Sequence, residues 1–163
     1  VEHDSHGEFI YAVCEYVRFS GDRELLAELW PAIRRAAEHI EALCATRRTP
    51  EFSSGPLRAR FGLLPESASH EGYLAHPVHS YFDDFYALRA LDDAAELGGW
   101  LGEHDDARRM AAQRAALAEA LYASIDTVIA ERDLRYVPGS VEWADFDANA
   151  TATAIATTDA AER

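Results

Sequence analysis

The chain has 163 residues, of which 48% are hydrophobic and 27% are charged, a composition typical of one globular domain. Its 29 acidic and 15 basic residues give a net charge of −14, which repels nucleic-acid phosphate and anionic lipid but not a neutral carbohydrate. No apolar run is long enough to cross a bilayer. These features predict neither a nucleic-acid partner nor a membrane partner.

The ends of the chain and its cysteines say little about where the protein works. The sequence begins at Val1 without a methionine or a signal-like segment, which is typical of an excised or processed piece and leaves the localisation unknown. Cys14 and Cys44 lie among apolar residues of predicted helices. Two such cysteines form no disulfide framework, so we expect buried free thiols.

The first 45 residues predict two helices. Residues Ser5–Glu8 fit a capping box, so a helix should begin there and end near Phe19. After the turn at residues 20–22, a second helix should run to about Ala45 with one apolar stripe. We expect a break or a fresh first turn at Trp30-Pro31, because proline removes a backbone donor from a helix.

The rest of the chain predicts a long loop and three more helices. Residues 47–79 hold too many prolines and glycines for a long helix, and they are too apolar for a floppy linker, which is typical of a functional loop. Helices should follow over about Ser80–Leu97 and about Asp105–Ala130. After a turn-rich connection, Asp147 can cap a fifth helix that the chain end cuts short. No segment alternates like a strand, so the predicted fold is all-α, a single segment over residues 1–163.

Polar residues of catalytic type gather at three junctions, each just before an apolar helix. These junctions are residues 3–6, 65–84 and 143–147. If the apolar helices form an inner ring, their N-terminal ends share one mouth, and the three junctions converge there. The sequence therefore predicts one site built from all three.

Four stretches spread over nearly the whole chain carry a family resemblance: HDSHGEFIYAVCEYVRFSGD, GLLPESASHEGY, HSYFDDFYALRALDDAAELGGWLG and ADFDANATATAIA. In these stretches the chain resembles the six-hairpin glycosidase superfamily, which includes glucoamylases and trehalases. The resemblance implies helical hairpins of an (α/α)6 toroid, a carbohydrate substrate and cleavage of a glycosidic bond. Because only part of the helices of such a barrel is present, it also implies an incomplete barrel, inactive alone, whose partner is the remaining portion of the barrel or a second copy.

The resemblance also implies where the general acid lies. In the glucoamylase branch the acid comes from an acidic loop ahead of an inner helix, and Glu66 and Glu71 stand in the matching loop here. Glu66 is the first candidate because it follows two leucines and a proline, and apolar surroundings keep a carboxyl protonated. The family's Trp-Glu-Glu pattern is absent, so Glu71 stays open as the second candidate. The resembled base lies beyond the end of the chain, with Asp4 and Asp147 as local candidates.

Further residues of the three junctions are candidates for binding the sugar. Aromatic rings can stack on a pyranose, and carboxylates and imidazoles can bind its hydroxyls. The expected substrate-binding residues are Asp4, His6, Tyr73, His79, Tyr81, Asp83, Trp143 and Asp147. As structural alternatives, Asp4 and Asp147 suit helix caps and Asp83 suits the first turn of a helix.

No metal or other cofactor is predicted. The seven histidines form no HExxH motif, and the chain has no paired-cysteine motif and no calcium loop. Two further functions remain open beside the glycosidase. One is a helical-repeat scaffold that binds a protein or peptide, against which the long loop argues, and the other is a degenerate domain that binds sugar without cleaving it.

Overall fold

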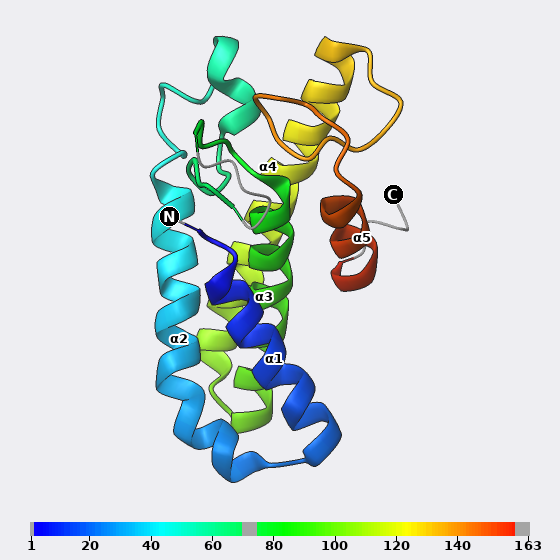
Figure 1. Ribbon diagram of the computed structural model, residues 1–163. Helices are drawn as coiled ribbons and strands as arrows, with labels where there is room; N and C mark the ends of the chain where they lie inside the picture. Colours follow the sequence, from blue (N-terminus) through cyan, green and yellow to red (C-terminus); the bar gives the residue numbers. More distant parts are fainter. Residues whose placement is uncertain (1, 70–74, 159–163) are drawn as a thin grey trace.

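The computed structural model describes residues 2–69 and 75–158 (Figure 1). Over these residues the chain is all-α, as the sequence predicts, and contains isolated β-bridges but no strand. In chain order, the helices are α1 (Ser5–Ser20), α2 (Arg23–Ala45), the short 3-10 helix η1 (Gly55–Arg60), α3 (Tyr81–Leu101), α4 (His104–Arg132) and α5 (Ala148–Thr157).

Consecutive long helices run in opposite directions, and α3 is the central one (Figure 1). Helix α3 contacts α1, α2, α4 and α5, whereas α5 has no other helical neighbour among the described residues. The N-terminal ends of α1, α3 and α5 point to the same end of the molecule, the upper end in Figure 1. The described helices thus form two antiparallel hairpins and the start of a third.

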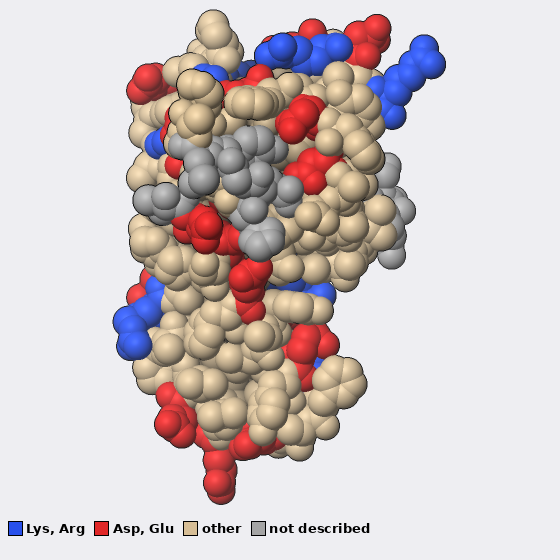
Figure 2. Space-filling model, viewed as in Figure 1, with Lys and Arg blue, Asp and Glu red and all other residues tan. Residues whose placement is uncertain are grey.

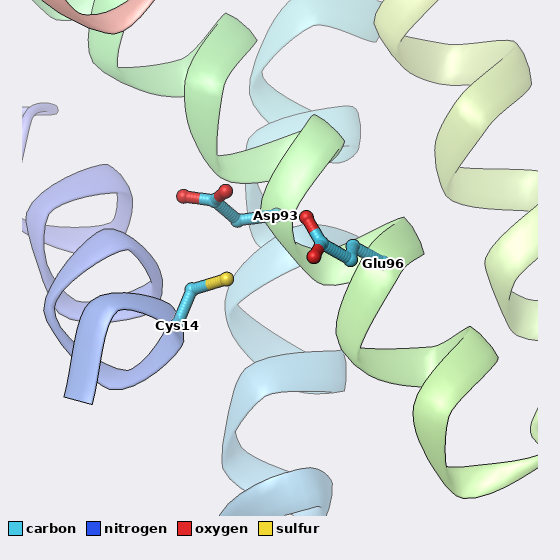
Figure 3. A group of neighbouring side chains, drawn as sticks. All are labelled: Cys14, Asp93 and Glu96. Atoms are coloured by element: carbon cyan, nitrogen blue, oxygen red, sulfur yellow. The ribbon is translucent and has the colours of Figure 1, made fainter. Parts of the chain in front are cut away.

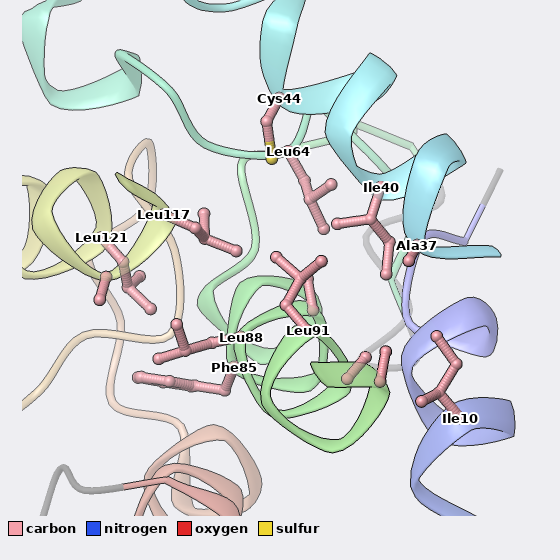
Figure 4. Packing of buried hydrophobic residues seen from close by; sticks show 14 of the residues in the cluster. Ile10, Ala37, Ile40, Cys44, Leu64, Phe85, Leu88, Leu91, Leu117 and Leu121 are labelled. Atoms are coloured by element: carbon pink, nitrogen blue, oxygen red, sulfur yellow. The ribbon is translucent and has the colours of Figure 1, made fainter. Parts of the chain in front are cut away.

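The core lies where α3 meets α1, α2 and α4 (Figure 4). Phe85, Leu88 and Leu91 of α3 are almost completely buried, and they meet Ile40 of α2 and Leu117 of α4. Neighbouring helices cover α3 on several sides. This explains why the sequence of α3 is apolar around most of the helix circumference. Burial of these side chains is the main stabilising contribution to the fold.

The end of α1 and the start of α2 agree with the sequence, but the start of α1 and the end of α3 do not. Asp22 caps α2 by accepting from the backbone N–H of Leu25, and Gly21 and Gly102 adopt the left-handed conformation that ends α1 and α3. The predicted capping box at Ser5 is wrong. Ser5 is already helical, and its hydroxyl lies 3.4 Å from the carboxylate of Asp4, so it is not available to the backbone N–H of the first turn.

Helix α2 continues through Pro31, where a break was expected, and α3 extends past its predicted end at Leu97. Helix α2 shows no break at Pro31, because Trp30 and Ile33 are buried on the same side and hold the helix against its neighbours. Helix α3 runs through Gly98 to Leu101. A Cβ at Gly98 would lie 2.8 Å from the Trp30 ring, so this glycine gives the ring its space rather than ending the helix.

Arginine supplies all the basic charge, since the sequence contains no lysine. On the face shown in Figure 2, acidic side chains are scattered from one end to the other, and several arginines lie at the upper end. None of the described helices combines the length and the apolar composition that a membrane span requires.

Candidate functional site

Backbone hydrogen bonds join the loops around the N-terminal end of α3. Ser67 and Val78 pair with each other through both backbone N–H groups, at 2.9 and 3.0 Å. The N–H of Tyr81 donates to the carbonyl of Gly139 at 3.0 Å, and the N–H of Val141 donates to the carbonyl of His79 at 3.1 Å. Two of the three predicted junctions, the loop before α3 and the loop before α5, are therefore held side by side.

His79 lies at the centre of this contact and is completely buried. Its Nδ1 is 2.8 Å from Oε1 of Glu142, and its backbone N–H donates to Oε2 of the same carboxylate at 2.8 Å. Nε2 accepts from Nε–H of Arg47 at 3.2 Å, so Nδ1 carries the proton and donates to Glu142. Arg60 also donates to Glu142, at 2.9 Å. Burial raises the pKa of Glu142, but the hydrogen bonds from His79 and Arg60 help to lower it by more, and the carboxylate stays ionised.

Glu66 is bound to the other side of Arg47 by a charged hydrogen bond, and its side chain is 43% exposed. Burial alone raises the pKa of Glu66, but its own backbone N–H, His79 and Arg47 together lower it below the ordinary value. The surroundings thus favour the ionised form, in contrast to the protonated carboxyl that the sequence suggested. As it stands, Glu66 is suited to accept a proton or a hydroxyl hydrogen bond rather than to donate a proton.

Asp83 has the opposite character, with only 1% of the residue exposed. The hydroxyls of Ser67 and Ser69 donate to its two oxygens at 2.5 and 2.7 Å. Burial raises the pKa of Asp83 to about 6, and the two hydroxyl bonds limit the rise. Asp83 therefore holds the loop before α3 through Ser67 and Ser69. Its favourable interaction with the dipole of α3, expected for an acidic residue in a first turn, is only part of its role.

The neighbouring Asp84 is buried still more completely. One of its oxygens accepts from the backbone N–H of Leu64 at 2.9 Å, and the other has no hydrogen-bond partner among the described residues. Burial raises the pKa of Asp84 well above its ordinary value and so favours the protonated carboxyl. Two adjacent carboxyls with raised pKa values thus lie beneath the loop that carries Glu66.

Asp4 is buried and lies near enough to Asp83 to raise the pKa of that carboxyl. Its backbone starts α1, but its side chain makes no capping hydrogen bond. His6 lies beside His39 of α2, with ring centroids 4.5 Å apart, and burial and the charge of His39 lower the pKa of His6. The structure therefore places Asp4 with the buried carboxyls and sets His6 against α2.

Two predicted sugar-binding residues have structural roles. Tyr81 is completely buried and its hydroxyl is 2.8 Å from that of Ser124, so the ring cannot stack on a sugar and the expectation for this residue is wrong. Asp147 caps α5 by accepting from the backbone N–H groups of Asn149 and Ala150, at 2.8 and 3.1 Å. This is the structural alternative that the sequence offered for Asp147, and as a cap it uses one carboxylate oxygen, Oδ1, for both bonds.

Exposed aromatic rings lie in the connection from α4 to α5. The exposed fractions of Trp143 and Phe146 are 55% and 63%, and Tyr136 packs edge-on against Phe146 with ring centroids 5.7 Å apart. The ring of His76 lies 6.5 Å from that of Trp143. Of the predicted stacking residues, Trp143 is accessible, whereas Tyr73 and the candidate acid Glu71 lie outside the described residues.

A group of potential metal ligands lies away from these loops, where Cys14 of α1 faces Asp93 and Glu96 of α3 (Figure 3). Burial raises the pKa of the Cys14 thiol to about 12, so it is protonated at neutral pH. Asp93 accepts from both Arg18 and Arg89, and Glu96 also accepts from Arg18. A cation here would displace two guanidinium groups and ionise a buried thiol, so the donor set suits an ion-pair network. Both cysteines are buried and free, as predicted.

Comparisons with protein-family models, with curated proteins and with solved structures found no match for this chain. The family resemblance of the sequence therefore stays a prediction, and the geometry described above carries the functional argument.

Proposed function

We propose that this chain is a segment of a six-hairpin glycoside hydrolase that contributes one wall of a carbohydrate site. The alternation of helix direction supports this arrangement, because α1, α3 and α5 all present their N-terminal ends to the same end of the molecule. Helices α2 and α4, which follow α1 and α3 in the chain, run in the opposite direction. A toroid of hairpins requires this pattern, and its closure requires further hairpins beyond α1 and α5.

One observation carries the proposal: the partly exposed, ionised Glu66 stands on loops that are ordered by hydrogen bonds to buried carboxyl groups. These groups belong to Asp83, Asp84 and Glu142. Glu66 is fixed by Arg47, Arg47 by His79, and His79 by Glu142. A carboxylate held in this way is preorganised to bind a sugar hydroxyl or to activate water. Trp143, from the adjoining loop, supplies an exposed ring of the kind on which a pyranose stacks.

The lowered pKa of Glu66 changes its proposed role from general acid to base or hydroxyl acceptor. Glu71, in the same loop, then becomes the first candidate for the general acid on sequence grounds alone. The two assignments give different results when each glutamate is replaced by glutamine.

The test uses the protein with its natural flanking sequence and a panel of glycans, measuring affinity and released reducing ends separately. Glu66→Gln should lower turnover by about 100-fold, the loss expected when a positioned acid or base is removed. Glu51→Gln is the matched control, because Glu51 is an exposed glutamate of the same loop region and should leave turnover unchanged. Trp143→Ala should weaken glycan binding by about tenfold, which corresponds to about 1.4 kcal/mol.

Each outcome separates the open functions. Binding without cleavage in the unmodified protein would indicate a degenerate sugar-binding domain. A protein that neither binds nor cleaves any glycan of the panel would overturn the carbohydrate function. Cleavage that survives Glu66→Gln but not Glu71→Gln would place the catalytic carboxyl at Glu71 alone.

The exposed apolar side chains of the first and last helices, α1 and α5, support an incomplete barrel. Phe19 and Tyr16 of α1 are 89% and 49% exposed, and Ile155 of α5 is 57% exposed. Contiguous exposed apolar side chains drive association, although the net charge of −14 opposes it. We expect light scattering to show self-association of the isolated 163-residue chain, and Phe19→Ser to reduce it. A monomer at high concentration would argue that no further hairpin covers α1.

A further inference from the structure

A cavity of about 430 Å³ lies between α4 and the segment from Arg48 to Phe61, outside the site described above. Small side chains of α4, Ala116, Ala120 and Ala123, line one side of it. These alanines recur at helical spacing on one face, and their size leaves the space open. The volume lies in the range of pockets that hold small molecules.

Two arginines line this cavity without a carboxylate partner. Arg47 and Arg60 are bound to Glu66 and Glu142, but their neighbours in the sequence, Arg48 and Arg58, form no ion pair within the described part of the chain. Glu119 also lines the cavity but pairs with neither arginine, so the cavity keeps a net positive charge.

The remaining polar groups of the cavity are occupied by the protein itself. The hydroxyl of Ser53 donates to the carbonyl of Pro50 at 2.8 Å, and that of Thr127 to the carbonyl of Ala123 at 2.7 Å. Ser124 donates to the carbonyl of Ala59 and meets the hydroxyl of Tyr81. The two guanidinium groups are therefore the free donors, and Phe61, which is 38% exposed, offers an aromatic face.

We propose that this cavity binds a small molecule that carries an oxyanion group, a phosphate or a carboxylate, attached to a ring. The guanidinium groups of Arg48 and Arg58 bind the oxyanion, since the planar donor fork of arginine matches phosphate and carboxylate oxygens. The ring packs between Phe61 and the alanine face of α4. Phosphorylated sugars and uronic acids have this chemistry. The inference does not depend on the glycosidase function, because neither Glu66 nor Trp143 of the proposed carbohydrate site lines this cavity.

The experiment is isothermal titration calorimetry of the full chain with glucose 6-phosphate, glucuronate, inorganic phosphate and neutral glucose. We expect glucose 6-phosphate or glucuronate to bind, inorganic phosphate to bind more weakly, and glucose not to bind. Arg48→Gln and Arg58→Gln should each weaken binding by about tenfold or more, because a charged hydrogen bond is lost. Arg35→Gln, which removes an exposed arginine of α2, is the control with the same change of charge and should have no effect.

A second variant removes space and leaves charge intact. Ala123→Leu fills the cavity at an exposed helix position, so the fold should be preserved, which circular dichroism checks, while binding is lost. A preference for glucose 6-phosphate identifies phosphate as the recognised group, and a preference for glucuronate identifies carboxylate. The proposal is overturned if neither binds, if glucose binds equally well, or if Arg35→Gln weakens binding as much as Arg48→Gln.

Discussion

Gly7→Ala is expected to lower the free energy of unfolding by about 3 kcal/mol or more, at the upper end of what overpacking costs. Gly7 is buried in α1 where that helix crosses α3, and a Cβ at this position would lie 2.7 Å from both the carbonyl carbon and the carbonyl oxygen of Tyr86. The obstacle is backbone, which cannot rotate away as a side chain can. The two helices would have to separate along their contact, and the buried side chains beside it would lose packing.

The matched control is Gly99→Ala, in α3. Gly99 is exposed, it has no atom within 4 Å of the added Cβ, and its backbone is helical. Alanine should therefore raise the free energy of unfolding by about 0.5–1 kcal/mol, the difference in helix propensity between the two residues. Urea denaturation followed by circular dichroism measures both variants. Equal effects of the two substitutions would mean that α1 and α3 do not approach each other as closely as described.

The helices of this fold could be predicted because their apolar residues recur at helical spacing. The predicted end of the fourth helix at Ala130 is within two residues of the observed end at Arg132, and the predicted cap Asp147 does cap α5. Local sequence signals were misleading where tertiary contacts oppose them. Pro31 does not break α2, because burial of Trp30 and Ile33 outweighs the missing backbone donor.

The candidate site could be predicted only in part, for a related reason. Sequence position places polar residues at the junctions before α1, α3 and α5, but it does not show which of them face solvent. Tyr81 looks like a stacking ring and is core, and Glu66 looks like a shielded acid and is paired with Arg47. Glu142 was missed altogether, because its partner His79 is 63 residues away and no local pattern marks such a pair.

Asp83→Asn is expected to raise the free energy of unfolding at pH 7 by up to about 3 kcal/mol, and to leave it nearly unchanged below pH 4. The pKa of Asp83 rises from 3.8 to about 6 on folding, because burial opposes its charge. The folded state therefore binds more protons than the unfolded state between these two pH values. Stability from this group is greatest below about pH 4, falls as the pH rises to about 6, and is constant above, a loss of about 3 kcal/mol in all.

Asparagine removes the titration and keeps the shape. Its carbonyl oxygen can accept from one of the two serine hydroxyls that now donate to Asp83, and its amide can donate to the other. Asp92→Asn, at an exposed position of the same helix, is the control for the change of net charge. Carboxylates whose pKa folding lowers, such as Glu142, contribute the opposite trend, but equally in the unmodified protein and the variants, so they cancel in the difference.

The measurement is the difference in unfolding free energy between Asp83→Asn and the unmodified protein, by urea denaturation at intervals from pH 3.5 to 7.5. A difference that grows from pH 4 to 6 and then levels off would confirm the raised pKa of Asp83. A constant difference over this range would mean that Asp83 titrates as an ordinary carboxyl. Water would then reach this carboxyl, which the structure describes as buried. Glycan affinity of the same variant then separates a structural role of Asp83 from a role in positioning the proposed carbohydrate site. A variant that is more stable but binds glycan less well has lost a group that positions the site.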